Sequence, residues 1–501
     1  MSVLRRNLSS NMLLLIIQMV TTFLMTPIFI RSLGNHDYGV WELVGSIVGY
    51  MSILDLGLSP AIARYVAKHN ADRNLDALQK VYSSSFVLLG VIGLVLGLSL
   101  ITFGYFWPEY AAAEGDDNYK KYQILFLVIG LQLIYIFPGI VLVSVLEGTQ
   151  LYNVKNNIVV INSIVALPVL YFLINEKNAL LLLAISGFLF QLVKYVYYFW
   201  YVESRLGYRL LSRHNVSVPT LKTLLTFSFK SFIQGTSHRV SQYADNFIIA
   251  AFVGTAHIVF YSLANALLRQ VSMLVANITS VFLPYFTDKF VKSDQQGLTD
   301  SYMSATKMTS GLIIFALCGI SVLGDNFISL WVGPSYAEQS YLVLQVLVIY
   351  SFAYLFNPFD NRLVTALNVH GKFAKIAILE SALNVVLSLV LVQVLGLVGV
   401  ALGTLLAVIV GKTLKTMHCA RVLDVGLVKF VFEPLLPNIL PCLISLLLLL
   451  VLDSSVNSFI QLFVVVVVTS VIWFFITLFF ALSATEKRYV IDLLLRKRIA
   501  D

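Results

Sequence analysis

Residues 82–106 read YSSSFVLLGVIGLVLGLSLITFGYF, and residues 457–483 read NSFIQLFVVVVVTSVIWFFITLFFALS; neither run contains a charged side chain. About 20 consecutive apolar residues form a helix that is long enough to cross the hydrocarbon core of a bilayer. Fourteen stretches of this kind follow one another along the chain, near 11–31, 40–58, 82–106, 121–146, 157–174, 179–202, 226–252, 257–283, 306–331, 340–367, 373–394, 396–418, 435–452 and 457–483. The sequence therefore predicts an all-α integral membrane protein with 14 transmembrane helices.

The composition supports this prediction. Hydrophobic residues make up 58% of the chain and charged residues only 12%, whereas soluble domains carry about 25% charged residues. Inside a bilayer only helices and closed barrels satisfy every backbone N–H and C=O group. The apolar runs are longer and more continuous than the alternating strands of a barrel, which have about 10 residues. We therefore expect a helical bundle and no nucleic-acid partner, despite the net charge of +8.

The basic residues predict the orientation of the chain. If the N-terminus is cytoplasmic, only four of the 34 Lys and Arg residues fall in outer segments, namely Arg31, Lys120, Lys121 and Lys177. Cytoplasmic loops are enriched in Lys and Arg, so both termini are predicted to be cytoplasmic. Residues 11–31 contain Gln18, Thr22 and Pro27 and show no small-residue cleavage pattern. We expect them to form a permanent span and not a signal peptide.

Enzyme signatures are absent from the sequence. Cys318, Cys419 and Cys442 lie in or near spans without metal-ligand spacing, so we expect neither a disulfide nor a metal site. There is no phosphate-binding loop, nucleophile elbow or dinucleotide fingerprint. A membrane-embedded polysaccharide polymerase or ligase, the alternative from another class, normally needs a larger outer loop than 107–120. A scaffold subunit, a third alternative, has little reason to carry the polar helix faces described below.

A weak internal repeat at a spacing near 220 residues divides the chain. Gly34 is followed seven residues later by Trp41, and Gly254 is followed seven residues later by Tyr261. Six helices per repeat give two parallel lobes, and transporters built in this way bind their substrate between the lobes near the midplane. The expected organisation is two pseudo-symmetric six-helix lobes (1–202 and 221–420), a cytoplasmic linker (203–220), and a pair of extra helices with a basic cytoplasmic tail (421–501).

Short motifs spread along the whole chain carry a family resemblance. They include Ile30-Arg31-Ser32-Leu33-Gly34, Tyr38-Gly39-Val40-Trp41, Asp55-Leu56-Gly57-Leu58, Ala63-Arg64-Tyr65, Phe227-Ser228, Tyr261-Ser262 and Leu330-Trp331-Val332-Gly333. Their order and spacing resemble the polysaccharide transporter family of oligosaccharide flippases, in the multidrug/oligosaccharidyl-lipid/polysaccharide exporter superfamily. The resemblance implies a flippase for polyprenyl-diphosphate-linked oligosaccharides, the precursors of O-antigen, capsule or exopolysaccharide, in the bacterial inner membrane. A peptidoglycan-precursor flippase and a cation-coupled multidrug exporter are the nearest alternatives.

Polar residues at helical spacing predict a hydrated cleft. The first predicted span carries Asn11, Gln18 and Thr22 on one face, and the second carries Glu42. The seventh carries Gln234, His238, Gln242 and Asp245, and the eighth carries Asn265 and Arg269. Ionisable groups inside a membrane are costly, so they tend to face a wet cavity. We expect Asn11, Gln18, Thr22 and Gln234 to line the cleft.

Two arginines are the strongest candidates for substrate binding. At 1.5 Å per residue, Arg269 lies about 18 Å below the outer end of its helix and Arg239 about 20 Å below the outer end of its own. Guanidinium groups match phosphate oxygens in geometry and charge. The predicted site for the diphosphate and the first sugars therefore consists of Arg239, Arg269, His238, Lys230, Gln242 and Asn265. The alternative is a structural ion pair between Arg269 and Asp245 or Glu42.

The remaining intramembrane charges have other expected roles. Asp245 and Glu42 are candidates for coupling to H⁺ or Na⁺, because a carboxyl in a low dielectric readily binds a proton. No other cofactor is expected. Lys412 and Lys415 are expected to reach toward the cytoplasmic surface, and Arg362 and Glu380 to form a structural pair. Other polysaccharide-assembly proteins are possible partners at the basic cytoplasmic loops.

Overall fold

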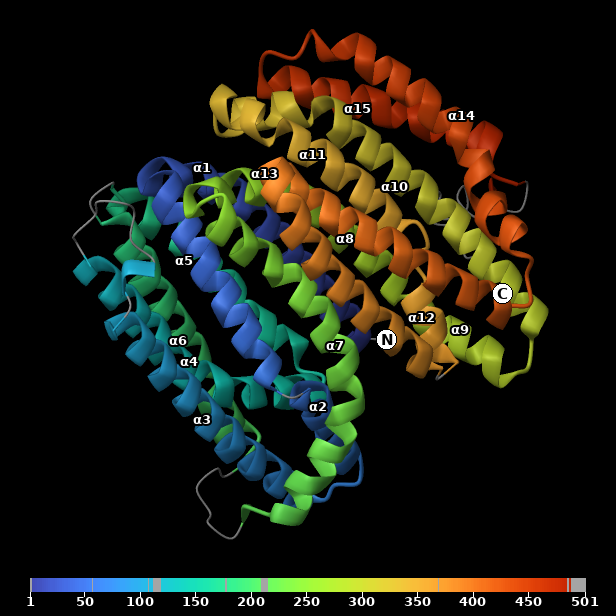
Figure 1. The fold of residues 1–501 in the computed structure, drawn as a ribbon. Helices are drawn as coiled ribbons and strands as arrows, with labels where there is room; N and C mark the ends of the chain where they lie inside the picture. Colours follow the sequence, from blue (N-terminus) through green and yellow to red (C-terminus); the bar gives the residue numbers. More distant parts are fainter. Residues whose placement is uncertain are drawn as a thin grey trace. The chain divides into compact units, whose positions relative to one another are not determined.

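The computed structural model folds the predicted stretches into long helices (Figure 1). It describes residues 2–55, 57–106, 108–110, 119–175, 178–208, 215–367, 369–483 and 486–487, and for 2–6, 8, 110, 229–231, 233–239, 242 and 370 it describes the backbone only. In these ranges every regular element is helical. The longer elements are α1 (Ser2–Met51), α2 (Leu58–Ala71), α3 (Leu75–Phe106), α4 (Tyr119–Gly148), α5 (Tyr152–Leu173), α6 (Ala179–Arg205), α7 (Val218–Phe252), α8 (Ile258–Ser280), α9 (Phe282–Val291), α10 (Gln295–Trp331), α11 (Pro334–Leu355), α12 (Asp360–Ala366), α13 (His370–Val422), α14 (Leu427–Asp453) and α15 (Phe459–Ile476). Short helical turns are η1 (Ser52–Asp55), η2 (Pro108–Tyr110), η4 (Thr255–His257) and η5 (Thr477–Ala481).

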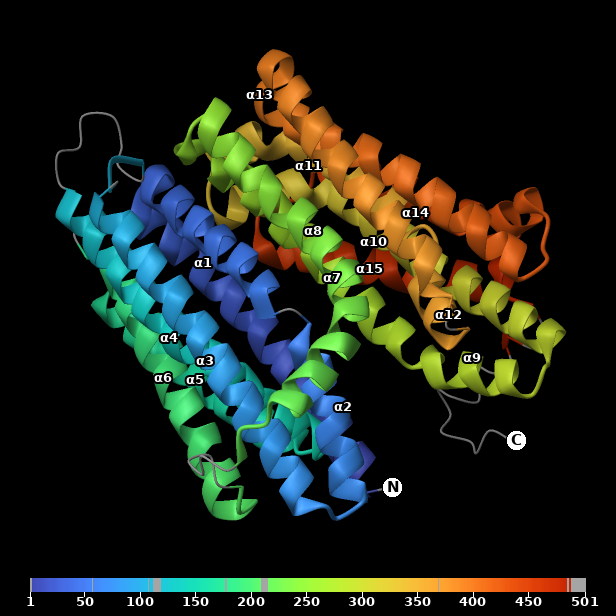
Figure 2. The same ribbon diagram turned by 60° about the horizontal axis from the view of Figure 1, so that its bottom comes forward.

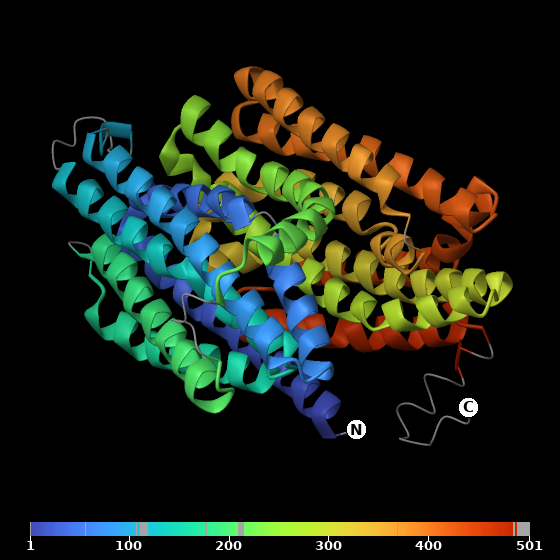
Figure 3. The same cartoon turned by 90° about the horizontal axis from the view of Figure 1, so that it is seen from below.

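Two helices, α1 and α13, each contain two predicted crossings. Each is interrupted by one non-helical glycine, Gly34 with φ 68° in α1 and Gly396 with φ 55° in α13. Glycine adopts such positive φ values without the steric penalty that a Cβ atom causes. The halves of α13 fold back on each other (Figure 3). Asn384 Nδ2 on the first half donates to Thr404 Oγ1 on the second at 2.8 Å.

The predicted all-α membrane fold is confirmed. Among the described residues, eleven helical segments are long and apolar enough to span a membrane. The segments containing α1 and α13 hold two predicted crossings each, and α7 contains the remaining one. The predicted span 340–367 is not continuous, because α11 ends at Leu355 and α12 begins at Asp360. Pro358 lies in this break; proline has no N–H group to donate in a helix.

The chain forms two compact units. The first comprises residues 1–250 and 254–258, and the second comprises 251–253 and 259–501. In the first unit α3 packs along α4, and α4 packs along α6 (Figure 2). A Cβ atom on Gly97 would lie 2.5 Å from the Gly130 carbonyl oxygen, so the backbones of α3 and α4 approach each other as closely as glycine allows. Such close contact through small residues is a main source of helix association in membranes.

In the second unit, the two extra C-terminal helices, α14 and α15, pack against α10. It packs along α11 and α14 and also contacts α15. The rings of Phe315 on α10 and Trp473 on α15 are stacked with centroids 4.8 Å apart. Near one end of α10, Asn326 Nδ2 donates to Asp453 Oδ1 at 2.7 Å. The extra helices therefore contact α10 at two positions along its length, near Phe315 and near Asn326.

The structural division differs in position from the boundary expected at 203–220. The whole of α7 up to Ala250 clusters with the first unit. The contacts responsible join α7 to the second half of α1.

Candidate functional site

Arg269 and Asn265 lie one helical turn apart on α8, in the second unit. The Arg269 side chain is exposed and that of Asn265 is half-buried. Within the described part of the second unit, the structure gives Arg269 no carboxylate partner. A guanidinium in the middle of a predicted span that keeps its donors available is able to bind an anionic group.

The predicted cavity residues of α1 fall into two groups. Gln18 and Thr22 are exposed and lie on one face, as their spacing of four residues predicts. Asn11 instead takes part in the contact with α5, where its Oδ1 accepts from Asn156 Nδ2 at 2.6 Å. Asn156 is only 1% exposed, so Asn11 also has a packing role in the first unit.

Glu42 and Asp245 both belong to the first unit. Glu42 is half-buried on the second half of α1, and Asp245 is 5% exposed on α7. One turn after Glu42, Ser46 Oγ accepts from Nδ2 of Asn246, the residue that follows Asp245, at 2.9 Å. The ring of Tyr50 lies close enough to Asp245 for the two groups to interact electrostatically. The two candidate coupling carboxyls are therefore on neighbouring helices of one unit.

Five predicted site residues have backbones in α7 but side chains outside the described residues. They are Lys230, Gln234, His238, Arg239 and Gln242. Their roles stay predictions. Among the side chains that are described, no group of three or more His, Cys, Asp and Glu residues is placed to hold a metal ion.

Two of the expected roles for intramembrane charges were wrong. Glu380 pairs with Lys415, whose Nζ lies 2.7 Å from its Oε2, and not with Arg362. Lys412 does not reach the surface, because its Nζ lies 2.7 Å from Asp360 Oδ2, and Asp360 is 2% exposed. Both lysines are on the second half of α13, which the hairpin at Gly396 brings against the preceding elements. A single helix considered alone could not reveal these partners.

Lys412 is part of a buried polar cluster that the sequence did not predict. Its Nζ also donates to the Asn357 carbonyl oxygen at 2.9 Å, and Asn357 Oδ1 accepts from the Tyr302 hydroxyl. Asn357 lies in the break between α11 and α12, where the regular helical bonding is interrupted. The Lys412 ammonium thus donates a hydrogen bond to one backbone carbonyl at this break and neutralises the charge of one carboxylate. The Asn-Pro sequence at 357–358 was the available signal for an interruption.

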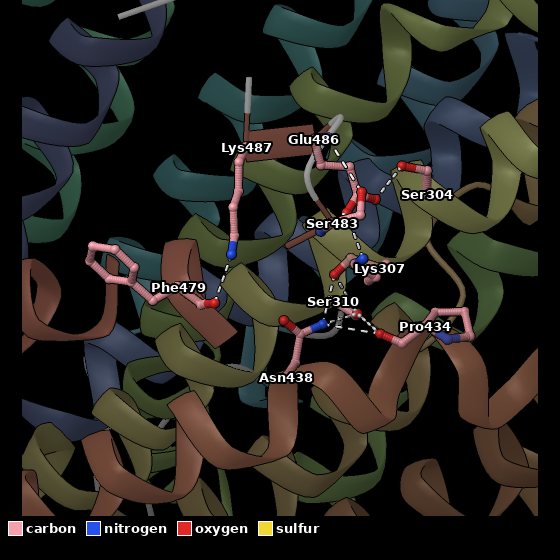
Figure 4. A network of polar contacts seen from close by, with 9 residues as sticks. All are labelled: Ser304, Lys307, Ser310, Pro434, Asn438, Phe479, Ser483, Glu486 and Lys487. Carbon is pink, nitrogen blue, oxygen red and sulfur yellow. Dashed lines mark hydrogen bonds and ion pairs between the residues drawn. The ribbon is translucent and has the colours of Figure 1, made fainter. Parts of the chain in front are cut away.

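A second unpredicted cluster joins the C-terminal segment to α10 and α14 (Figure 4). Glu486 accepts hydrogen bonds from Lys307 Nζ at 2.6 Å, Ser304 Oγ at 2.7 Å and the Ser483 amide at 2.8 Å. Asn438 Nδ2 on α14 donates to the Lys307 carbonyl oxygen at 2.7 Å. Burial by itself would raise the pKa of Glu486, but the Lys307, Ser304 and Ser483 donors outweigh it and lower this pKa to about 2.

The comparisons with known proteins agree with the motif resemblance. A family model described as polysaccharide biosynthesis protein matches residues 4–290. The putative O-antigen transporter of Shigella flexneri is 23% identical over 402 residues, covering 79% of this chain and 92% of the relative. The probable low-salt glycan biosynthesis flippase Agl15 of Haloferax volcanii is 22% identical over 414 residues, covering 80% of each chain.

Solved structures share the fold. The lipid II flippase MurJ in an inward closed conformation has a TM-score of 0.70 at 14% identity, covering 94% of this chain and 97% of that chain. A multidrug resistance MATE family transporter of the MOP superfamily, in an inward-facing conformation, has a TM-score of 0.66 at 14% identity, covering 81% and 94%. These relatives are transporters and not enzymes. The chain belongs to the polysaccharide biosynthesis protein family, and it is a multi-pass membrane transporter with the fold of the MOP superfamily.

Proposed function

We propose that this protein moves polyprenyl-diphosphate-linked oligosaccharide units from the inner to the outer leaflet of the bacterial inner membrane, for O-antigen, capsule or exopolysaccharide synthesis. Both termini would be cytoplasmic. The names of the O-antigen transporter and glycan flippase relatives support this substrate class. The observation that carries most weight is the exposed Arg269 in the middle of α8, beside Asn265.

The physical barrier explains why a protein is needed. Each hydroxyl group placed in hydrocarbon without a partner costs roughly 4–8 kcal/mol, and an oligosaccharide has many of them in addition to the diphosphate charge. A protein pocket that opens to each side in turn removes this barrier without covalent chemistry. The polyprenyl chain can remain in the lipid throughout, because it is itself apolar.

In this proposal Arg239 and Arg269 bind the diphosphate, and His238, Lys230, Gln242 and Asn265 contact the diphosphate or the adjoining sugars. Each hydrogen bond to a charged group contributes about 1.5–3 kcal/mol, which corresponds to about 10- to 100-fold in binding. Gln18 and Thr22, both exposed on α1, would contact sugar hydroxyls or water. Asn11 and Gln234 would contribute to the same lining.

The arginine proposal is tested by export in cells that lack the native gene. We expect Arg269→Ala and Arg239→Ala to lower surface polysaccharide at least about 10-fold at normal membrane levels of protein, with partial recovery in Arg269→Lys. Arg421→Ala is the matched control, because Arg421 is exposed at the cytoplasmic end of α13. Full export by both alanine variants would remove the arginines from the site.

The substrate class is tested separately from the residues. Cells without the protein should accumulate polyprenyl-diphosphate oligosaccharides on the inner leaflet, which mass spectrometry of extracted lipids identifies. Accumulation of a peptidoglycan precursor instead would support the peptidoglycan alternative. No change in any lipid-linked sugar would reject the proposed function.

We further propose that Asp245 or Glu42 couples transport to H⁺ or Na⁺. The burial of Asp245 supports this role, since a buried carboxylate is stabilised by binding a cation or a proton. In proteoliposomes, Asp245→Asn should transport at a rate that no longer changes when the ion gradient is removed. An unchanged gradient dependence in both Asp245→Asn and Glu42→Gln would exclude these carboxyls.

A further inference from the structure

α2 is a short amphipathic helix that joins two candidate membrane spans of the first unit. It follows the span Ser9–Asp55 and precedes the span Leu75–Phe106, and the orientation predicted from the basic residues places it at the cytoplasmic surface. Arg64 is exposed on this helix. The opposite face is buried and consists of Leu58, Ala61, Ile62 and Val66.

Arg64 is held against the beginning of α7. Its guanidinium lies over the ring of Phe227, with the central carbon 4.5 Å from the ring centroid. The ring of Tyr65 meets the same Phe227 ring edge to face, with centroids 6.1 Å apart. Gly57 permits this approach of α2 to α7 (Figure 2), because a Cβ atom there would lie 3.0 Å from the Ser228 carbonyl oxygen.

The contact with Phe227 leaves the hydrogen-bond donors of Arg64 available. A cation is attracted to the face of an aromatic ring through its charge and does not need its N–H groups for this contact. Within the described residues of the first unit, the structure gives Arg64 no carboxylate partner. Lys68, one helical turn further along α2, is also exposed. Guanidinium and ammonium groups in this arrangement are suited to phosphate oxygens.

Phe227 begins the row of α7 positions that carries several predicted cleft residues. Gln234, His238 and Asp245 follow it at intervals of seven, four and seven residues. These intervals return to the same side of a helix with 3.6 residues per turn, and the backbone of α7 is helical throughout. Arg64 therefore lies at the predicted cytoplasmic end of this row, and the buried Asp245 lies about 27 Å further along it.

We propose that Arg64, positioned by Phe227 and assisted by Lys68, is an entry site that binds the diphosphate of the substrate lipid at the cytoplasmic surface. The inference rests on the proposed function. The polyprenyl chain of such a lipid remains in the hydrocarbon, so its diphosphate lies at the level of the lipid head groups, outside the spans, where α2 is expected. An ordinary phospholipid head group carries one phosphate, and two neighbouring cations therefore favour the diphosphate.

Photo-crosslinking beside Phe227 tests whether the diphosphate lipid is bound there. Thr223 is exposed one turn before Phe227, and p-benzoylphenylalanine in its place captures a molecule held at this position. In inverted membrane vesicles that contain the substrate, mass spectrometry of the full chain should find an adduct with a polyprenyl-diphosphate oligosaccharide. Arg64→Ala should lower the yield of this adduct at least about 10-fold, and Arg269→Ala should not. An equal yield in Arg64→Ala, no lipid adduct, or an adduct with phosphatidylglycerol in its place would overturn the proposal.

Transport kinetics in proteoliposomes provide a second readout. Arg64→Ala should raise KM about 10-fold and change the maximal rate by less than about twofold, as the loss of a binding contact does. Phe227→Leu should act in the same direction, and Arg64→Lys should recover part of the affinity. The matched control is Arg205→Ala, because Arg205 is also exposed and its guanidinium carbon lies 5.9 Å from the centroid of the Trp200 ring.

The outcomes separate the entry site from the proposed function. An unchanged KM in Arg64→Ala would overturn the entry site and leave the proposed function standing. A crosslinked adduct with a peptidoglycan precursor would support the entry site, whose ligand is the diphosphate, and would reject the oligosaccharide substrate.

Discussion

The second half of α13 and the middle of α8 both carry cations inside predicted spans, but the surroundings of these cations are opposite. Lys412 on α13 lies between a buried carboxylate and a backbone carbonyl, with 11% of its side chain exposed. Arg269 on α8 is exposed, and no carboxylate of the second unit's described residues pairs with it. A cation of the first kind already donates its hydrogen bonds to groups of the protein itself. A cation of the second kind keeps its hydrogen-bond donors available.

The difference separates structural charges from candidate functional ones. Four ion pairs of the second unit can be ranked by the exposure of the acidic side chain, which is 2% for Asp360, 13% for Glu486, 15% for Glu380 and 40% for Asp294. Breaking a pair costs more when the remaining charge is less hydrated. The stability effects of substitutions should therefore follow burial and number of partners, while Arg269 should affect transport and not stability.

The largest effect is expected at Lys412. Lys412→Ala leaves the buried Asp360 carboxylate without its partner, which costs about 3–5 kcal/mol and should sharply reduce the yield of folded protein. The Lys412→Ala/Asp360→Ala double variant should recover part of the loss, because no charge then remains buried alone. Fluorescence-detected size exclusion and the thermal midpoint in detergent measure both effects. Arg269→Ala is the control and should unfold like the native protein; equal losses at both sites would break the comparison.

A smaller loss is expected at the pair between Glu380 and Lys415. Here both side chains are partly exposed, at 15% and 14%. Glu380→Gln keeps the shape but removes the charge, so the expected loss is about 2–3 kcal/mol. The thermal midpoint should fall less than in Lys412→Ala. Arg362→Ala should leave it unchanged, and the reverse order would restore the pairing that the sequence predicted.

At Glu486 the effect depends on pH. Hydrogen bonds from Lys307, Ser304 and Ser483 lower the pKa of Glu486 to about 2, below the ordinary glutamate pKa. These interactions therefore contribute their full stability above pH 4.5, and the contribution is lost as the pH falls toward 2. Glu486→Gln should cost about 2–3 kcal/mol at pH 7, similar to Glu380→Gln, because the two acidic side chains are similarly exposed. The midpoints of variant and native protein should converge between pH 4.5 and 2.5. A difference that is constant over this range would show that the charge plays no part.

The smallest effect is expected at the beginning of α10. Asp294 caps this helix by accepting from the Gly297 amide at 2.8 Å, and it pairs with Lys289 at 2.7 Å. The Lys289 ammonium and the Gly297 amide lower the pKa of this carboxyl. Asp294→Asn preserves a cap and should be nearly neutral, whereas Asp294→Ala should lower the thermal midpoint slightly. A loss as large as that of Glu486→Gln would show that exposure does not rank these pairs.

The fold could be predicted from the sequence because the bilayer allows few alternatives. Runs such as 82–106 must be helices, and the predicted span corresponds closely to α3 at Leu75–Phe106. The break at 356–359 was not predicted, although Pro358 signalled an irregularity. The apolar character of a segment measures its tendency to enter the membrane. A short break in the helix does not interrupt the apolar sequence, because distant side chains such as Lys412 can form the hydrogen bonds that the backbone loses there.

The candidate site was predictable only in part. Helical spacing placed Gln18 and Thr22 on one face, and depth along a helix singled out Arg269. Spacing could not show that Asn11 packs against Asn156, since that partner lies 145 residues away in the chain. It also gave Glu380 the wrong partner, because Arg362 and Lys415 fall at similar predicted depths.

The sequence by itself determined the solvent of this protein, its helices and their number, because apolar length and backbone hydrogen bonding leave little choice in hydrocarbon. Only the tertiary structure decided which polar groups meet. Lys412 pairs with Asp360, Glu486 pairs with Lys307, and α7 packs against α1. The free energy of a buried charge or of a close helix contact depends on the neighbour that packing brings within a few ångströms, and this neighbour cannot be identified from a single helix.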